Sequence, residues 1–173
     1  MICPNKRSKT NNWRAFEPVQ NARLCIQPAG GASEDQDFET WPTTGAWGTT
    51  IHEGWTLSDG QVKGSRGGFG PPRDSRCGWL YDFDDSPTSW LQSPTYAPGV
   101  LSVSFWTRQD TTFATNSYVV LEKSSNEVDW TAVEAFTIDS FDWMQHTSSV
   151  DSIGTTYLRI RKTGDDGDNT YAG

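Results

Sequence analysis

The chain has 173 residues, and its aromatic residues comprise nine Trp, eight Phe and five Tyr. This length suits one domain, and large aromatic side chains, which bury roughly 150–250 Å² each, can build its core although aliphatic residues are few. No apolar run approaches the roughly 18 residues of a membrane-spanning helix, and the formal net charge of -8 disfavours binding to a nucleic-acid phosphate backbone.

Residues 1–34 are polar and show neither helical nor strand periodicity, so we expect an N-terminal arm or linker. The start of the chain lacks the apolar stretch of a signal peptide, which predicts either a protein not exported by that route or a fragment of a longer chain. Cys3, Cys25 and Cys77 lack the paired spacing of a metal cluster or a dense disulfide framework. We interpret them as ordinary thiols, with a Cys3–Cys25 bridge as the alternative in an oxidising compartment.

Residues 35–173 predict one all-β domain, a two-sheet antiparallel β-sandwich of jelly-roll type. Short apolar and aromatic runs recur there between Gly, Pro, Asp, Asn and Ser, and no stretch has a convincing apolar repeat at helical spacing. In chain order the predicted strands are 38–41, 54–57, 79–83, 89–92, 100–108, 117–123, 130–138, 143–150 and 157–162. Such a series of strand-length runs with turn residues between them is typical of a sandwich or barrel.

Alternation within the strongest runs assigns side chains to the two faces of the predicted sheets. The expected core positions are Leu101, Val103, Phe105, Val119, Leu121, Leu158 and Ile160. Outward positions of the same runs are expected to form one ligand-binding face, made of Trp106, Arg108, Tyr118, Tyr157, Arg159 and Arg161. Trp130 and Trp143 are interpreted as packing residues of the core or of a hairpin.

Four motifs, in order along the chain, resemble those of jelly-roll modules of the carbohydrate-binding-module, MAM and cleaved-adhesin type. They are Asp37-Phe38-Glu39 with Gly54-Trp55, residues 89–94 (SWLQSP) with 99–106 (GVLSVSFW), residues 124–131 (SSNEVDWT), and residues 157–162 (YLRIRK). The resemblance covers about residues 37–173 and implies the jelly-roll fold. It says less about function, because members of these families bind glycans, mediate adhesion or space other domains.

The same resemblance implies a structural calcium ion with Glu39 as a ligand, joined by backbone carbonyls from the 60s of the chain, since calcium takes about six to eight oxygen ligands. In these families the last strand usually runs into a segment whose Asp helps to bind the ion, whereas this sequence stops at Tyr171-Ala172-Gly173. That departure removes an expected ligand and suggests truncation from a larger protein. Residues 165–169 are rich in oxygen atoms but lack the spacing of an EF-hand loop, so a solvated turn is expected.

The predicted face combines aromatic rings, which stack on sugar rings, with arginines, which hydrogen-bond hydroxyl groups. These residue types also anchor protein interfaces, so a glycan and a protein surface are both candidate partners. The expected function is a non-catalytic recognition or adhesion module of a larger extracellular, cell-surface or virion-surface protein. The alternative is a structural subunit, such as a capsid decoration protein or a filament component, whose N-terminal arm contacts neighbours in a homo-oligomer or larger assembly.

No pattern in the sequence predicts catalysis. His52 and His146 are the only histidines, neither belongs to a nucleophile motif, and His146 is expected on a strand surface. The three aspartates within 82–85 form a turn cluster, whereas a glycosidase needs two carboxylates facing one cleft. The Gly-rich residues 64–72 lack the Lys-Ser/Thr ending of a phosphate-binding loop, so we expect a loop between strands.

Overall fold

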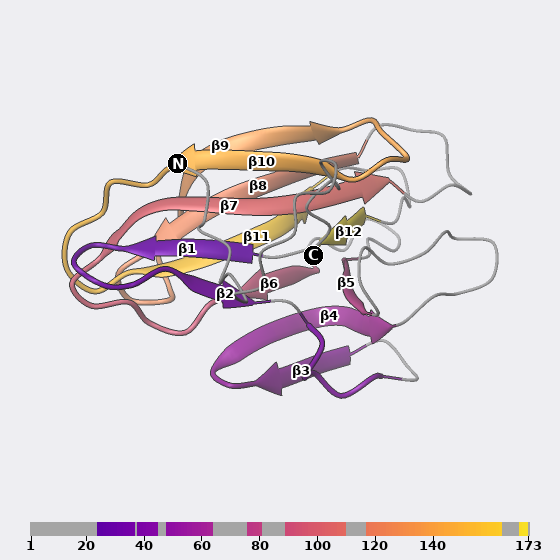
Figure 1. Cartoon of the computed structure of the whole chain (residues 1–173), viewed down its shortest axis with the longest axis horizontal. Coiled ribbons are helices and arrows are strands. Elements are labelled where there is room, and N and C mark those ends of the chain that lie inside the picture. Colours follow the sequence, from indigo (N-terminus) through magenta and orange to yellow (C-terminus); the bar gives the residue numbers. More distant parts are fainter. Residues whose placement is uncertain are drawn as a thin grey trace, which may run out of the picture.

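The computed structural model describes residues 24–36, 38–44, 48–63, 76–80, 89–109, 117–163 and 170–172, which contain strands and no helix. The strands are β1 (Leu24–Pro28), β2 (Glu34–Gln36), β3 (Gly48–His52), β4 (Trp55–Lys63), β5 (Cys77–Leu80), β6 (Trp90–Gln92), β7 (Val100–Gln109), β8 (Ser117–Ser124), β9 (Thr131–Ile138), β10 (Met144–Ser149), β11 (Tyr157–Thr163) and β12 (Thr170–Ala172). Within these ranges no helix has the length and hydrophobicity needed to cross a membrane. Figure 1 shows their arrangement.

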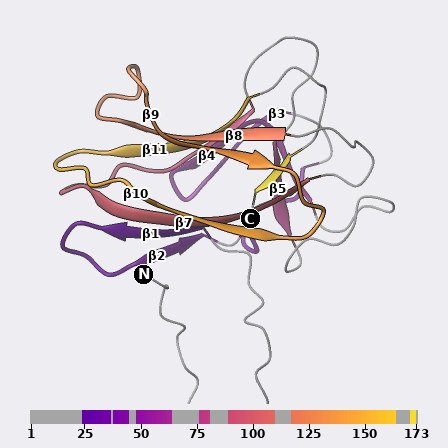
Figure 2. The same ribbon diagram turned by 90° about the horizontal axis from the view of Figure 1, so that it is seen from above.

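The strands form two facing layers, which Figure 2 shows edge-on. One layer contains β2, β1, β7 and β10, and the other contains β3, β4, β6, β11, β8 and β9 in that spatial order. All pairings are antiparallel. Hydrogen bonding also passes from layer to layer, because β12 pairs with both β7 and β5, and β5 pairs with β4. This architecture is the two-sheet antiparallel sandwich that the sequence predicts.

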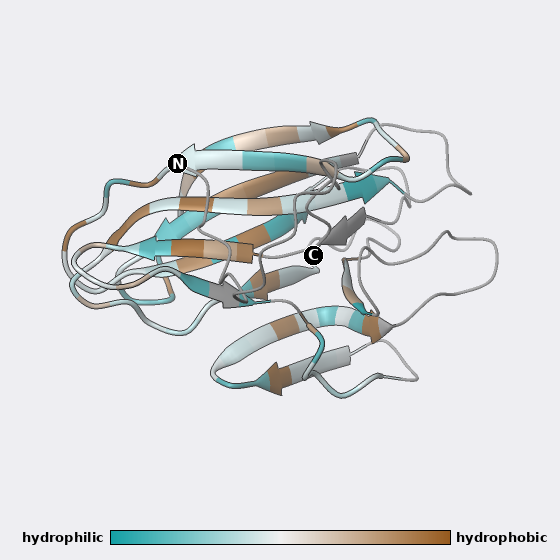
Figure 3. Cartoon of the chain, viewed as in Figure 1, coloured by the Kyte–Doolittle hydropathy of each residue, from teal (hydrophilic) through white to brown (hydrophobic). Residues whose placement is uncertain are grey.

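The core lies between the layers and is built from apolar side chains at alternate strand positions. Figure 3 shows hydrophobic and more polar segments alternating along β7. Six of the seven expected core residues are at most 3% exposed, namely Val103, Phe105, Val119, Leu121, Leu158 and Ile160. The alternation of apolar residues therefore predicts the inner faces of β7, β8 and β11 correctly, apart from one position.

Leu101 is the exception, because its side chain is 44% exposed. Opposite β1, Gln27 pairs with Ser102 and Pro28 pairs with Val100, so Leu101 is the extra residue of a β-bulge in β7. A bulge shifts the alternation by one residue, which buries Val100 and turns Leu101 outward. The prediction that Leu101 belongs to the core is wrong for this reason.

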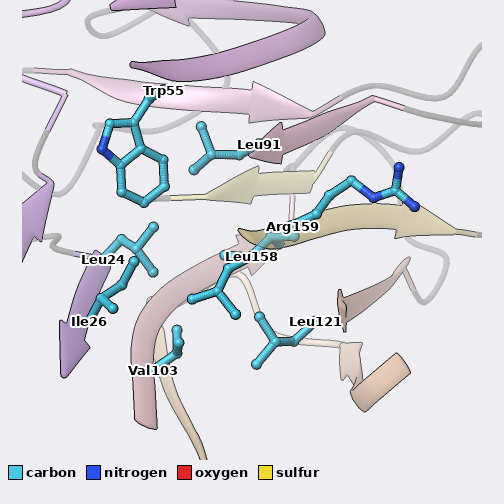
Figure 4. Close-up of a pocket in the computed structure, with 9 residues that line it drawn as sticks. Leu24, Ile26, Trp55, Leu91, Val103, Leu121, Leu158 and Arg159 are labelled. Carbon is cyan, nitrogen blue, oxygen red and sulfur yellow. The ribbon is translucent and has the colours of Figure 1, made fainter. Parts of the chain in front are cut away.

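Side chains from both layers meet closely in the middle of the sandwich. In Figure 4, Trp55 and Leu91 of one layer face Leu24 and Val103 of the other, while the guanidinium of Arg159 points away from them. The cavity that these apolar residues line measures about 10 Å³. That is no more than the space of a single water molecule, so this region is packed core and offers no room for a ligand.

The predicted boundary between an arm and a domain at residue 35 does not match the fold. β1 pairs with the long strand β7, and Leu24 and Ile26 belong to the core. The apolar run of β1 is short, and Cys25 interrupts it. Its alternation is therefore not recognisable in the sequence. Cys25 is disulfide-bonded, so its interpretation as an ordinary thiol is wrong, whereas Cys77 is a buried thiol outside any disulfide. Residues 1–23, which contain Cys3 and the remainder of the predicted arm, lie outside the described residues.

The predicted strand at 38–41 is a turn. The N–H of Trp41 donates to the carbonyl of Phe38 at 3.1 Å, and Phe38 has a positive φ of 62°. Both rings are fully buried, with their centroids 5.1 Å apart. Their apolar character reflects insertion into the core from a turn, which a period-two interpretation of so short a run cannot distinguish from a strand.

Candidate functional site

Four of the six predicted face residues lie on one outer surface of the sandwich. Tyr157, Arg159 and Arg161 alternate with inward-facing Leu158 and Ile160 along β11, so they point away from the core. Tyr118 occupies the equivalent outward position on β8, the strand that pairs with β11. The structure therefore brings these four residues together, as the sequence predicts.

Trp106 and Arg108 lie elsewhere, on β7 of the other layer. Arg108 is only 6% exposed, and its guanidinium lies 5.7 Å from the centroid of the Trp143 ring. Trp143 packs against Cys77 and Trp79 in a small second apolar cluster. Alternation identifies Arg108 as outward from its own layer, but it does not reveal the segments that cover it.

Strand register adds further side chains to the surface around β11. Arg159 lies between Gln92 of β6 and Glu122 of β8, and Arg161 lies between Trp90 of β6 and Val120 of β8. Directly opposed residues on neighbouring strands point to the same face of a sheet, which makes them contacts of the two arginines. We call this surface the arginine face; it consists of Trp90, Gln92, Tyr118, Glu122, Trp130, Tyr157, Arg159 and Arg161.

Glu122 joins the two arginines of this face. Its Oε2 accepts a hydrogen bond from Arg159 Nε at 2.7 Å, and its Oε1 accepts one from Arg161 Nη2 at 2.8 Å. Burial acts to raise the pKa of Glu122, but the hydrogen bonds and positive charges of both arginines outweigh it, so the pKa lies below its ordinary value. The carboxylate is therefore charged at neutral pH and holds both guanidinium groups in place.

Trp130 covers one of these guanidinium groups. The guanidinium carbon of Arg159 lies 4.1 Å from the centroid of the Trp130 ring, a close cation–π contact. The indole N–H of Trp130 donates to the backbone carbonyl of Glu127 at 3.1 Å, and Gln92 Nε2 donates to the Glu127 carboxylate at 2.9 Å. The ring is half-buried and held on two sides. Trp130 lies in the hairpin between β8 and β9, as predicted, but no sequence pattern predicts its contact with Arg159.

Glu39, the predicted calcium ligand, lies next to the backbone of Arg76 in the described part of the structure. Glu39 Oε1 accepts the backbone N–H of Arg76 at 2.9 Å, and the Arg76 guanidinium donates to the carbonyl of Trp41. No group of three or more His, Cys, Asp or Glu residues within the described ranges is placed to hold a metal ion. Of the predicted carbonyl ligands from the 60s, residues 64–69 lie outside the described residues, as do the rest of the loop 64–72 and residues 82–85 and 165–169. The calcium site stays a prediction.

His146 is not on the strand surface where the sequence placed it. It lies opposite Phe105 in the pairing of β10 with β7 and therefore shares the inward face of that residue. Its ring lies 4.6 Å from that of Phe136 and 5.3 Å from that of Phe105, between centroids. Its Nε2 is 2.7 Å from the hydroxyl of Thr107. Burial lowers the pKa of His146, although the charge of Glu134 acts in the opposite direction.

The lowered pKa of His146 predicts how the stability of the fold depends on pH. Because the folded state disfavours the charged imidazole, the unfolded chain binds more protons, and stability falls as the pH drops below 6.5, the ordinary pKa. For one proton the loss is limited to about 1.4 kcal/mol per pH unit. Urea unfolding of the wild type at pH 7.5 and 5.5 should show this loss, and His146→Gln should reduce it. An equal loss in the variant would contradict the prediction; Glu122, with a pKa below 4.5, does not titrate in this interval.

His52 also contacts a threonine. Its Nε2 is 2.9 Å from the Thr40 hydroxyl, and the Glu53 carboxylate is 3.7 Å from the same nitrogen. A catalytic triad needs the carboxylate on the opposite ring nitrogen, where it orients the imidazole. This arrangement is therefore not that of an activated nucleophile.

Comparison with known proteins supports the fold. No protein-family model and no curated protein sequence matches this chain. The crystal structure of the K2 cleaved adhesin domain of Lys-gingipain aligns with a TM-score of 0.56 and 16% identity, over 78% of this chain and 92% of that domain. TmCBM61 in complex with β-1,4-galactotriose aligns with a TM-score of 0.44 and 12% identity, over 78% and 85% of the two chains. The predicted resemblance to jelly-roll modules of this type is confirmed at the level of the fold.

Proposed function

We propose that this chain is a non-catalytic recognition module that binds a glycan on the arginine face, as part of a larger extracellular or surface protein. The observation that supports the proposal is the Trp130 ring, held by Arg159 on one side and by the Glu127 carbonyl at its N–H. An indole that is already fixed loses little conformational freedom when a sugar ring stacks on it. The similarity to an adhesin domain agrees with a recognition function.

Hydrogen-bond donors lie next to this ring. Each guanidinium has five N–H donors, and the bonds to Glu122 use Nε and Nη2 of Arg159 and of Arg161. Within the described residues, Nη1 of neither arginine has a hydrogen-bond partner. These groups are available to sugar hydroxyls. The positive charges of the two arginines are matched by the carboxylates of Glu122 and Glu127, which favours an uncharged ligand.

The test is a glycan screen followed by calorimetric titration of the best ligand. Trp130→Ala should weaken binding about tenfold or more, because stacked aromatic residues dominate recognition surfaces, while Trp130→Phe should retain part of the affinity. Phe141→Ala, at an exposed aromatic residue of the β9–β10 loop, is the matched control and should bind normally. Glycan binding that Trp130→Ala leaves unchanged would contradict this site. Binding of proteins but of no glycan would instead favour a protein partner.

A further inference from the structure

A polar cleft opens at the end of the sandwich, next to the arginine face. It lies between the turn that joins β8 to β9 and the loop that joins β10 to β11, both on the left in Figure 2. Its volume is about 510 Å³, within the range of roughly 300–1,000 Å³ that is typical of small-molecule sites. None of the arginine-face residues lines it. We call it the end cleft.

Hydrogen bonds hold the wall of the end cleft on the β8–β9 side. The hydroxyl of Ser124 accepts the backbone N–H groups of Asn126 and Glu127, at 3.2 and 3.0 Å. The side-chain oxygen of Asn126 accepts those of Val128 and Asp129, both at 2.9 Å. These four bonds within one turn give it a defined shape before any ligand arrives.

The opposite wall is held in the same way. The Ser152 hydroxyl accepts the N–H of Val100 at 2.8 Å and the hydroxyl of Thr156 at 2.9 Å. The N–H of Gly154 donates to the Pro98 carbonyl at 2.6 Å, which ties the β10–β11 loop to the segment before β7. Both walls are therefore pre-organised, which reduces the entropy lost on binding.

Many polar groups of the end cleft are not used by the protein itself. The side chains of Ser125, Thr131, Asp151 and Thr155 make no hydrogen bond within the described part of the chain. Asp129 uses one carboxylate oxygen, which accepts from Asn126 Nδ2 at 2.9 Å. Carboxylates only accept hydrogen bonds, whereas hydroxyl groups both donate and accept. The lining thus offers more acceptors than donors.

The charge of the lining is also unbalanced. Asp129 and Asp151 contribute two negative charges, and Lys123, the only basic residue of the lining, donates its ammonium group to the carbonyl of Val150 at 2.8 Å. Ile153 is the one large apolar residue that lines the cleft. A ligand suited to this lining is small and hydroxyl-rich, donates hydrogen bonds and carries a positive charge.

From these features we infer that the end cleft is a second binding site, for a terminal sugar unit that carries a free amine. In this site the amine lies next to Asp129 and Asp151, and the sugar hydroxyls lie next to the serine and threonine side chains. This inference does not depend on the arginine face, which we expect to bind an uncharged glycan.

Titration of the ¹⁵N-labelled chain with D-glucosamine, D-glucose and D-glucuronate, followed by NMR, tests the inference. Shift changes should concentrate in residues 123–131 and 151–156, with glucosamine binding most tightly and glucuronate least. Asp151→Asn should weaken glucosamine binding about tenfold, since a charged hydrogen bond is lost. Asn tolerates the positive φ of 47° at this position, so the variant should fold.

Asp142→Asn is the matched control, because it removes the same charge from an exposed residue of the β9–β10 loop. It should bind glucosamine as the wild type does. Shifts that miss the end cleft, equal weakening by both variants, or tighter binding of glucuronate than of glucosamine would each overturn the inference. Tyr118→Ala, at an exposed arginine-face residue near the opposite end of β8, should leave glucosamine binding unchanged, which separates this site from the arginine face.

Discussion

Replacement of Trp41 by alanine is expected to lower the free energy of unfolding by about 3–5 kcal/mol, the range for removal of a large buried aromatic side chain. Trp41 is fully buried, contacts Phe38 and lies 5.4 Å from the His52 ring between centroids. The truncation leaves a cavity between a turn and the core. Urea unfolding followed by far-UV circular dichroism measures the change.

Trp41→Phe is the informative companion variant. The indole N–H of Trp41 is buried and finds no acceptor among the described residues, so phenylalanine removes an unsatisfied donor along with part of the ring. We expect this variant to lose less than about 1.5 kcal/mol. Equal losses of stability in the two variants would contradict this account. They would mean that the Trp41 N–H has a hydrogen-bond partner and that the cavity alone does not explain the cost of Trp41→Ala.

Replacement of Glu122 by alanine should cost about 3 kcal/mol, at the lower end of the range for breaking a buried ion pair, because the arginines keep some contact with water. The side chains of Arg159 and Arg161 are 16% and 24% exposed, and that of Glu122 is 7% exposed. Without the carboxylate, two guanidinium groups face each other with no shared counter-ion. Glycan binding on the arginine face should weaken as well, because Arg159 loses the group that holds it under Trp130.

Two measurements separate this ion-pair effect from a general effect of mutation. Asp139→Ala, at an exposed carboxylate, should change stability by no more than about 0.5 kcal/mol. The pKa of Glu122 is lowered, so its stabilising effect is complete above pH 4.5 and is lost as the pH falls through the lower folded value. The difference between wild type and Glu122→Ala should therefore shrink below pH 4.5. A difference that persists unchanged at pH 2.5 would contradict the ion-pair explanation.

Alternation predicts side-chain orientation well in this chain where strands are long and half-apolar. Leu158 and Ile160 face the core and Arg159 and Arg161 face outward, as expected from β11 alone. β3 and β12 were missed because their residues are largely small or polar, so their strand character comes from pairing with β4, β5 and β7. Short strands of this kind are specified by their neighbours more than by their own sequence.

The candidate site was only half predictable for a related reason. Sequence alternation gives the face of a strand, but it does not say which strands lie side by side. Glu122 alternates with the core residue Leu121 and so points outward, yet its burial follows from pairing of β8 with β11, which places arginines on two sides. Trp106 was grouped with Arg159 although β7 and β11 belong to different layers. Pairing is a long-range property that local periodicity does not contain.

β12 lies between two other strands at the point where the layers meet. Its three residues pair with β5 on one side and with the final residues of β7 on the other, so neither strand presents a bare edge there. Unpaired edges are templates on which strands of other molecules add, the first step of edge-to-edge aggregation. At the point where the two layers meet, β12 therefore covers two edges on which strands of another molecule could otherwise add.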